Sequence, residues 1–396
     1  MDFNYTEEQQ LLADSVDKFL DRNYSFDTRR QIIAARQGIS AAAWEGFASM
    51  GLLGLPIPPE HEGFGGAAVD TMIVMEALGK YLVVEPYLST VVLGASTIVL
   101  GGTESQRKTL LPNIVNGSLK LALAHGEPRA RFNSSYVETT ARQEGGAWII
   151  NGNKSLVLHG AVADLLIVSA RTSGKTGDPH GISLFFVNPA EAGVVGREYP
   201  TYDGMRAAEV DLTNVQIGAD SLIGVLDQAY PLIELVIDRG IAALCAEAVG
   251  CIGALNAATL EYLKTRQQFG VPIGRFQVLQ HRAVDMLIRY EEARSMACLA
   301  AVKVDSPDAT DRRRSVSAAK ELIGRAGRFV GQQAVQLHGG MGMTDELPVG
   351  HYFKRLTAID TLFGDSDHHL TRFATADASV SEAMPVAPKK RWKQIV

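Results

Sequence analysis

The feature that most constrains the fold of this 396-residue chain is the length of its helical patterns after residue 224. Apolar residues recur at helical spacing over about 229–268, 276–304 and 311–337, and no proline interrupts these stretches beyond the first turn. Helices of this length bury an apolar stripe by packing against one another. The pattern therefore predicts a four-helix bundle over residues 224–377, completed by two shorter helical patterns near its end.

The N-terminal part of the chain is also helical by pattern. Thr6 and Gln9 have the spacing of a capping box, and apolar residues follow on one face. Further helical patterns lie at 41–50, 67–82 and 86–100. These features predict an all-α domain over residues 1–118.

Between the two helical parts the apolar period changes toward two. Short apolar or β-branched runs alternate with clusters of Gly, Pro, Asn and Asp, as strands and turns do. The runs lie at 119–124, 148–150, 165–170, 182–187 and 210–217. This pattern predicts a β-barrel or sandwich over residues 119–223, so the fold class is α+β. An Ala-, Val- and Pro-rich stretch with a basic end predicts a flexible tail over residues 378–396.

Charge and composition argue against several classes of protein. The formal net charge of −6 is unlike the basic footprint of a nucleic-acid-binding protein. Acidic residues at Glu7 and Glu8 interrupt the N-terminus, so we expect neither a signal peptide nor a transit peptide, and we expect no membrane span. Three cysteines without Cys-x-x-Cys spacing predict buried thiols in a reducing compartment. We therefore expect a cytoplasmic protein.

Two stretches have the residue types of a dinucleotide site: Thr-Arg-Gln-Gln-Phe-Gly from residue 265 and Gln-Leu-His-Gly-Gly-Met-Gly-Met from residue 336. Arg266 carries forked donors suited to a pyrophosphate, and Gln336 can bond an adenine or ribose edge. Gly339 and Gly340 allow backbone N–H groups to approach a ligand that a Cβ would block. The alternative is that this glycine pair simply ends a helix.

Both stretches resemble the flavin signature of the acyl-CoA dehydrogenase family. The loop at 51–66, the turn and strand at 145–152 and the order of the three domains are similar to the same family, so the resemblance covers residues 1 to about 376. In that family the two stretches reach across a subunit interface to the ADP half of FAD. The resemblance thus implies a homo- or hetero-oligomer (a dimer or tetramer), an acyl-CoA substrate and an electron-transfer flavoprotein as electron acceptor. The residues that it implies at the FAD are Arg266, Gln268, Phe269, Gln336, Gly339 and Gly340.

The family removes the α-proton of an acyl thioester with a carboxylate, while hydride leaves the β-carbon for the flavin N5. In most members the carboxylate is a Glu shortly after the Gly-Gly motif, and no Glu stands in that window here. Counting forward from Gln336 leads to Phe363, whereas counting back from Leu370 and Arg372 leads to Asp365. The resemblance therefore makes Asp365 the candidate base, with capping of the following helix or stabilising of the turn as its alternative role.

A minority of the family carries the base on the first long helix of the bundle. That position falls on Gly240 here, and Asp238 lies about 200° around the helix from it. We expect Asp238 to be exposed or ion-paired. The small residues of 240–253 permit either close helix packing or room for an acyl chain.

The middle domain departs from the family at two contacts with the flavin ring. Gly126 replaces the Thr of a Thr-Glu-Pro segment, and the Trp-Ile-Thr segment reads Leu156-Val157-Leu158. His368 and His369 have no evident third ligand, so we predict no metal site. Three functions are open at this point: an FAD-dependent acyl-CoA dehydrogenase, a non-catalytic subunit that supplies the ADP-binding arm to an active homologue, and a reduced-flavin monooxygenase on the same fold.

Overall fold

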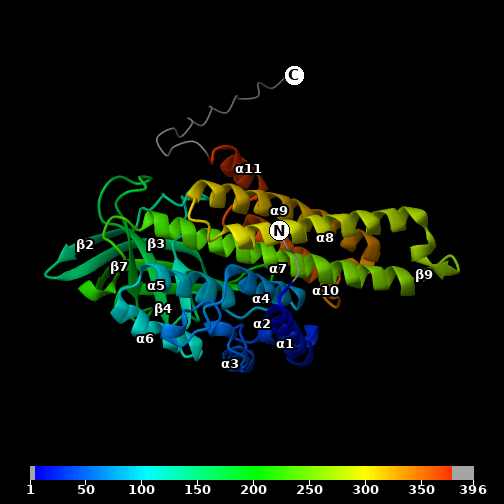
Figure 1. Ribbon diagram of the computed structural model, residues 1–396, viewed down its shortest axis with the longest axis horizontal. Coiled ribbons are helices and arrows are strands. Elements are labelled where there is room, and N and C mark those ends of the chain that lie inside the picture. The colour runs from blue at the N-terminus through cyan, green and yellow to red at the C-terminus, as the bar shows by residue number, and fades with distance from the viewer. Residues whose placement is uncertain (1–4, 377–396) are drawn as a thin grey trace, which may run out of the picture.

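The computed structural model describes residues 5–376, so the tail predicted over 378–396 lies outside the described residues. Figure 1 shows the sheet at one end of an elongated molecule, with the long helices α7, α8 and α9 running side by side toward the other end. The N-terminal helices lie along the flank of the long helices. Helical, β and helical parts thus follow one another in the chain, as the sequence predicts.

The N-terminal part is built of short helices that meet in one apolar core. Their bounds are α1 Glu7–Asn23, α2 Phe26–Ala34, α3 Ala41–Ser49, α4 Ala68–Lys80, α5 Ser96–Gly101 and α6 Glu104–Val115. The capping box is confirmed, because the Thr6 hydroxyl accepts from the Gln9 amide and the Gln9 side chain accepts from the Thr6 amide. The sequence patterns did not predict α2 and α6, although α6 begins with a second capping box, at Thr103 and Gln106.

The helix predicted over 86–100 contains an irregularity. Residues Leu88–Ala95 (η3) form a π-helix that continues into α5, and all eight of its residues are buried. A segment buried on every side has no polar face, so periodicity cannot reveal a change in its winding. π-Helical turns are concentrated at functional sites, which directs attention to η3.

The middle part is an eight-stranded sheet with strand order β6-β7-β3-β2-β4-β5-β8, and β1 pairs with β4. The strands are β1 Leu121–Ala124, β2 Thr140–Glu144, β3 Ala147–Leu158, β4 Leu165–Arg171, β5 Ile182–Val187, β6 Val194–Pro200, β7 Arg206–Ile217 and β8 Leu222–Ile223. The two halves of the sheet join at one residue pair, Thr140 and Arg171, and share an apolar core in which Trp148 lies 5.1 Å from Phe185 between ring centroids. This shared core between two half-sheets is the packing of a sandwich.

The last part is the helical bundle. Its helices are α7 Tyr230–Thr265, α8 Gln277–Lys303, α9 Ala309–His338, α10 Pro348–Thr361 and α11 Ser366–Ala374. The pattern over 229–268 overran the end of α7, because the next residues form a hairpin of β9 Gln267–Gln268 and β10 Val271–Pro272. Phe269 (φ 53°) and Gly270 (φ 80°) make the turn of this hairpin.

Helix α7 is the core helix of the molecule. Among residues 5–376 it is long and apolar enough to cross a membrane, which the sequence patterns did not predict, yet 72% of its most apolar stretch is buried in the protein. It crosses α4 at two glycines. A Cβ on Gly79 would lie 2.0 Å from the Glu247 carbonyl oxygen, and one on Gly250 would lie 1.9 Å from the Glu76 carbonyl oxygen. Part of the small-residue stretch therefore serves close helix packing.

A buried ion cluster joins the bundle to the sheet. Arg355 of α10 donates to Glu247 of α7 (Nη2–Oε2, 2.8 Å) and to Asp203 in the loop between β6 and β7 (Nη1–Oδ2, 2.8 Å). All three side chains are at most 6% exposed. Burial alone would raise the pKa of Asp203, but Arg355 outweighs it and lowers that pKa. We call these three residues the inter-domain latch.

Candidate functional site

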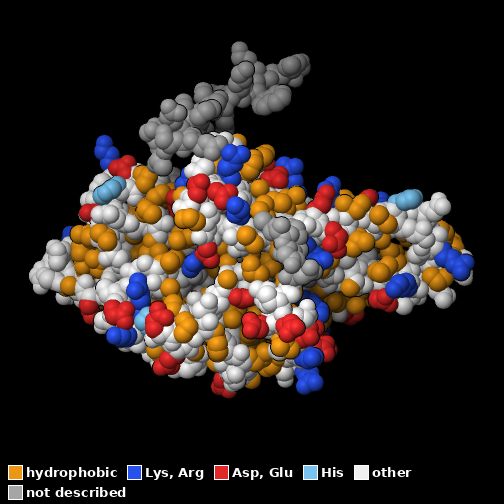
Figure 2. Space-filling model, viewed as in Figure 1, with side chains coloured by type: hydrophobic (Ala, Val, Ile, Leu, Met, Phe, Trp, Pro, Cys, Tyr) orange, Lys and Arg blue, Asp and Glu red, His pale blue; other side chains and the backbone are white. Residues whose placement is uncertain are grey.

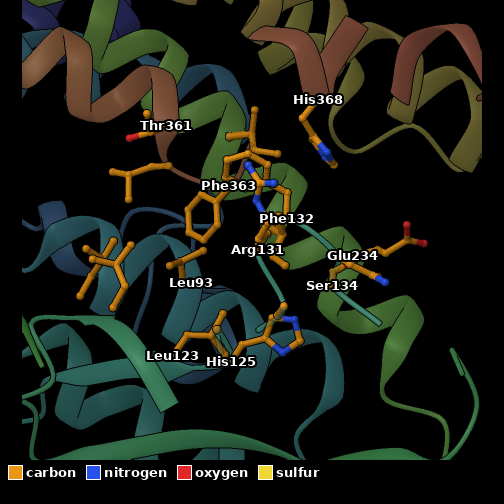
Figure 3. A pocket seen from close by; sticks show the side chains of 18 of the residues that line it. Leu93, Leu123, His125, Arg131, Phe132, Ser134, Glu234, Thr361, Phe363 and His368 are labelled. Atoms are coloured by element: carbon orange, nitrogen blue, oxygen red, sulfur yellow. The ribbon is translucent and has the colours of Figure 1, made fainter. Parts of the chain in front are cut away.

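A cavity of about 180 Å³ lies where η3, α7, the sheet and the turn between α10 and α11 meet. Figure 3 shows Leu93, Leu123 and Phe363 on one side of it and Ser134 and Glu234 on the other. The apolar side is formed by η3, β1, α7 and the turn, whereas the polar side comes from the loop before β2 and from α7. One side can therefore hold an apolar group while the other bonds a polar one.

Three of the four positions at which the sequence departs from the family signature line this cavity. Gly126, Leu156 and Leu158 all contribute to the wall. Leu156 has φ 51° and lies in a register shift between β3 and β7, which turns this part of the strand toward the cavity. Ser155 and Ser134 also line the wall. The spacing of the strands did not predict these two hydroxyls.

A buried polar cluster holds the loop that carries Gly126. Lys154 donates to Glu127 at 2.7 Å and to the Ser169 hydroxyl at 3.0 Å, and that hydroxyl also lies 2.9 Å from the ring of His125. Burial lowers the pKa of Lys154 to about 8, while burial and the Lys154 charge lower the pKa of His125 to about 4. His125 is therefore a neutral part of the cavity wall near neutral pH.

Hydrogen bonds hold the turn between α10 and α11 in place. The Lys320 ammonium, which is buried, donates to the carbonyl oxygens of Asp360 (2.9 Å) and Gly364 (2.7 Å). His369 bonds the carbonyl oxygen of Phe363 through Nε2 at 3.1 Å. Phe363 itself has φ 56°, a left-handed conformation that costs a bulky residue roughly 1 to 3 kcal/mol. The surrounding bonds thus force the Phe363 ring into the cavity (Figure 3).

Asp365, the candidate base, caps α11. Its Oδ1 accepts from the amide of His368 at 2.8 Å, which is the alternative role that the sequence allows. Asp365 is not among the residues that line the cavity. Of the described residues that do, Glu234 is the one with a carboxylate, and both of its oxygens accept from Arg313, at 3.1 and 3.2 Å.

Asp238 is ion-paired, as one of the two expectations for it stated, but it is not exposed. Its carboxylate accepts a hydrogen bond from Arg312 (Nε–Oδ2, 3.1 Å) and forms an ion pair with Arg372 (Nη2–Oδ1, 2.7 Å), and its side chain is 1% exposed. Arg372 belongs to α11 and lines the cavity. Asp238 therefore ties α11 to α7 from behind the cavity wall.

The predicted cofactor residues lie at the other end of α7. Arg266, Gln268, Gln336, Gly339 and Gly340 line one open groove of about 600 Å³. The sixth, Phe269, does not line it; its side chain is 92% exposed and meets Phe276 edge-on. The structure thus gathers five of the six residues that the family resemblance implies.

The residues of this groove fit a dinucleotide phosphate. Within residues 5–376 the Arg266 guanidinium has no hydrogen-bond or ion-pair partner, so its donors are available. Gly339 ends α9 at φ 59°, and the positions of a Cβ on Gly339 and Gly340 meet no protein atom within 4 Å. The Gly pair is therefore the end of a helix and also an open stretch of backbone facing the groove.

The groove and the cavity are separate sites in one chain. Ile241 lines the cavity and Tyr262 lines the groove, so the two sites are separated by 21 residues of α7, or about 31 Å along its axis. Figure 1 shows the corresponding separation between the sheet and the β9 hairpin.

Comparisons with known proteins decide the family. Family models for the N-terminal, middle and C-terminal domains of acyl-CoA dehydrogenases match residues 6–118, 122–216 and 232–376. The probable acyl-CoA dehydrogenase YngJ of Bacillus subtilis (strain 168) is 30% identical over 358 residues, which make up 88% of this chain and 92% of that protein. The chain belongs to the acyl-CoA dehydrogenase family.

Solved structures agree with this assignment. Butyryl-CoA dehydrogenase from Megasphaera elsdenii is 26% identical with a TM-score of 0.86, covering 95% of this chain and 99% of that chain. A chain of the ChsE4-ChsE5 complex from Mycobacterium tuberculosis is 25% identical with a TM-score of 0.86, covering 98% and 100%. The comparisons confirm the predicted fold class, the enzyme class and the FAD cofactor.

The structure also bears on the predictions for the cysteines and for metal binding. Cys245 and Cys251 are buried free thiols as predicted, whereas Cys298 is only partly buried. Burial raises the pKa of Cys245 to about 12. No group of three or more His, Cys, Asp or Glu side chains within residues 5–376 is placed to hold a metal ion.

Proposed function

We propose that this protein carries out FAD-dependent α,β-dehydrogenation of an acyl-CoA thioester in an oligomer. The observation that carries the proposal is the groove at the end of α7, which gathers Arg266, Gln336 and Gly340 about 31 Å from the cavity that would hold the reacting acyl group. The groove of one copy then completes the FAD site of its neighbour. Exposed apolar side chains on α8, at Val284 and Leu287, support an oligomer (Figure 2 shows apolar among charged side chains on this part of the surface).

Each part of the chain contributes a separate task to this reaction. Bound FAD would accept the hydride from the β-carbon. The Arg266 guanidinium and the open backbone at Gly340 would hold the ADP half of FAD. The apolar wall of Leu93 and Ile241 would exclude water, so that hydrogen bonds to the thioester oxygen act in a medium of low dielectric constant.

Asp365 is our proposal for the base that removes the α-proton. It lies next to the residues that form the cavity wall, and its carboxylate must release the His368 amide before it can reach a substrate. Loss of one cap bond costs about 1 kcal/mol, which substrate binding can offset. Electrons would leave through an electron-transfer flavoprotein, as in the family.

Asp365→Asn tests this role, because Asn also caps a helix but cannot accept the proton. We expect substrate-dependent flavin reduction to fall by at least about a hundredfold with FAD still bound. Asp367→Asn, in the exposed first turn of the same helix, is the matched control and should reduce flavin at the wild-type rate. Wild-type reduction rates in Asp365→Asn would remove Asp365 from the chemistry.

A second candidate function is a subunit without its own base in a heteromeric acyl-CoA dehydrogenase. It is favoured because the only carboxylate on the described cavity wall, Glu234, is bound by Arg313. The runs at 350–357 and 362–370 resemble the small subunit of pimeloyl-CoA dehydrogenase, and the ChsE4-ChsE5 complex shows that a similar chain occurs in a complex with another.

Purification of the chain alone and with a co-expressed paralogue separates these candidates. Acyl-CoA-dependent bleaching of bound FAD by the chain alone supports the proposed enzyme. Bleaching that appears only with the paralogue, and survives Asp365→Asn, supports the subunit without a base. Turnover that needs oxygen and externally supplied reduced flavin would instead support the monooxygenase.

A further inference from the structure

The cavity is smaller than most ligand sites, and the Phe363 ring is part of its apolar side. Its volume of about 180 Å³ lies below the roughly 300 to 1,000 Å³ that is usual for small-molecule pockets. The Phe363 ring projects into it from the turn between α10 and α11 and lies on the same side as Leu93 of η3 (Figure 3). Removal of this ring would enlarge the cavity on its apolar side.

The ring is held against the main chain of α7. A Cβ on Gly240 would lie 2.8 Å from the Leu93 side chain (Cδ2) and 3.3 Å from the Phe363 ring (Cε2). Gly240 is thus the point of α7 that Leu93 and Phe363 cover together. With no side chain of its own, Gly240 leaves the space that these two residues fill.

The position of the ring is fixed by its surroundings. Phe363 keeps a left-handed backbone conformation that a bulky residue adopts only when other bonds enforce it. Lys320 holds the carbonyl oxygens of Asp360 and Gly364 on either side, and His369 holds the carbonyl oxygen of Phe363. The Phe363 ring therefore has a fixed position, and it does not move aside easily for a longer ligand.

The polarity of the cavity decides which part of an acyl thioester contacts the Phe363 ring. The hydroxyl of Ser134 and the carboxylate of Glu234 lie on the polar side, whereas Leu93, Ile241 and Phe363 form the apolar side. An acyl chain lies against the apolar side, with its thioester toward the polar side. Its far end then points at Phe363 and Leu93.

We propose that the side chains of Phe363 and Leu93, which lie together over Gly240, form the wall at the far end of the acyl site. This wall restricts the protein to short acyl-CoA thioesters. The proposal rests on the proposed function, because that function supplies the acyl group. A short chain fills the space in front of the ring, and each further methylene group meets the ring or stays in water. In a longer pocket each buried methylene group strengthens binding about fourfold.

Equilibrium binding of saturated acyl-CoA thioesters to the FAD-loaded protein tests the proposal without needing turnover. Butyryl-CoA, octanoyl-CoA and dodecanoyl-CoA are titrated into the wild type, Phe363→Ala and Leu93→Ala. We expect the wild type to bind octanoyl-CoA no more tightly than butyryl-CoA. In both variants octanoyl-CoA should gain at least about tenfold over butyryl-CoA, because several methylene groups become buried.

Phe353→Ala is the matched control, because it removes the same ring from α10 where it packs over Gly331 of α9, away from the cavity. It should keep the wild-type preference for chain length. Phe363→Leu, which restores most of the bulk, should return the preference to that of the wild type. Thermal unfolding of each variant identifies any that fail to fold, and Leu93→Ala then tests the same wall from η3.

The outcomes distinguish a failure of the chain-length proposal from a failure of the proposed function. If the wild type and both variants bind acyl-CoA thioesters with the same dependence on chain length, the chain-length proposal is wrong and the proposed function stands. If the wild type already binds dodecanoyl-CoA more tightly than butyryl-CoA, the chain-length proposal is wrong as well. If the FAD-loaded wild type and variants bind none of the three thioesters, the proposed function is wrong for this cavity, and the chain-length proposal that rests on it is wrong too.

Discussion

At the scale of single residues, three buried histidines make this protein sensitive to acid. Burial lowers the pKa of His125 and His159 to about 4 and that of His369 to about 2. Their neutral rings bond partners inside the protein, as His159 does with the Val84 carbonyl oxygen at 2.9 Å. The unfolded chain therefore takes up protons at a higher pH than the folded chain does.

His159→Asn should weaken this acid sensitivity. Because the folded pKa of His159 lies below the usual value of 6.5, its contribution to stability is complete above pH 6.5 and is lost as the pH falls toward 4. That loss is on the order of 3 kcal/mol, at about 1.4 kcal/mol per pKa unit. Urea unfolding between pH 4.5 and 7.5 should give a shallower pH dependence for the variant. Parallel curves for the two proteins would show that His159 is not a source of the sensitivity.

Arg266→Ala should weaken FAD binding. Its guanidinium lines the groove and has no partner within residues 5–376, so a pyrophosphate would lose a charge-assisted bond worth roughly 1.5 to 3 kcal/mol. FAD retained after dilution and dialysis is the measurement. Arg275→Ala, an exposed arginine of the neighbouring turn outside the groove lining, is the control. Equal retention by both variants would place the cofactor elsewhere.

Single residues differ in how much of their environment the sequence reveals. The groove residues were predictable because two contiguous motifs carry them. The partners of Asp238 were not, since Arg312 and Arg372 lie 74 and 134 positions further along the chain. Helical periodicity places Asp238 on a different side of α7 from Gly240, but it cannot tell a solvent-facing side from a side covered by another helix.

At the scale of elements, the crossing of α4 and α7 depends on glycine. Gly79 and Gly250 each lie against a carbonyl group of the opposite helix, and the Cys251 thiol also bonds the Gly79 carbonyl oxygen at 3.2 Å. The backbones approach so closely that no side chain fits between them at these points. This contact explains why small residues are dense in the middle of α7.

Gly250→Ala should separate the two helices. The added Cβ would lie 1.9 Å from the Glu76 carbonyl oxygen, which no side-chain rotation can relieve. We expect a loss of about 2 to 3 kcal/mol in the free energy of unfolding, by analogy with overpacked cores. Gly196→Ala is the control, because a Cβ there meets no atom within 4 Å. A chemical denaturation midpoint that Gly250→Ala leaves at the wild-type value would contradict the close crossing.

The sequence predicted two kinds of element. The long helices were found from their apolar period. The strands β4 and β5 were found as short continuous apolar runs between turn residues, since nearly all of their residues are buried. The strands β2 and β6 were missed because most of their residues are exposed, so they carry no apolar alternation. The π-helix η3 was missed for the opposite reason, since every one of its residues is buried.

At the scale of the whole molecule, the inter-domain latch connects parts of the chain that the sequence presents as separate domains. Arg355 comes from α10, Glu247 from α7 and Asp203 from the loop between β6 and β7, and all three side chains are at most 6% exposed. Removal of one member leaves buried charges without a partner. The relative placement of sheet and bundle should therefore depend on this cluster.

Arg355→Met should destabilise the protein by roughly 3 to 5 kcal/mol, because Glu247 and Asp203 lose their shared partner. Arg289→Met removes an arginine whose pair with Glu292 is about half exposed, and such pairs contribute roughly 0 to 1 kcal/mol. Thermal unfolding followed by both near- and far-ultraviolet circular dichroism compares the two variants. Equal melting temperatures would mean that the latch adds nothing beyond packing.

The crossing of α4 and α7 also bears on how the chain is made. These helices are 150 residues apart in the sequence, from Lys80 to Tyr230. At roughly 5 to 20 residues per second, a ribosome takes roughly 8 to 30 seconds to pass from one to the other. Until then the face of α4 that bears Met72 and Gly79 has no partner helix. The N-terminal part of the nascent protein thus cannot complete its core during its own synthesis, and this face of α4 stays uncovered until α7 has emerged.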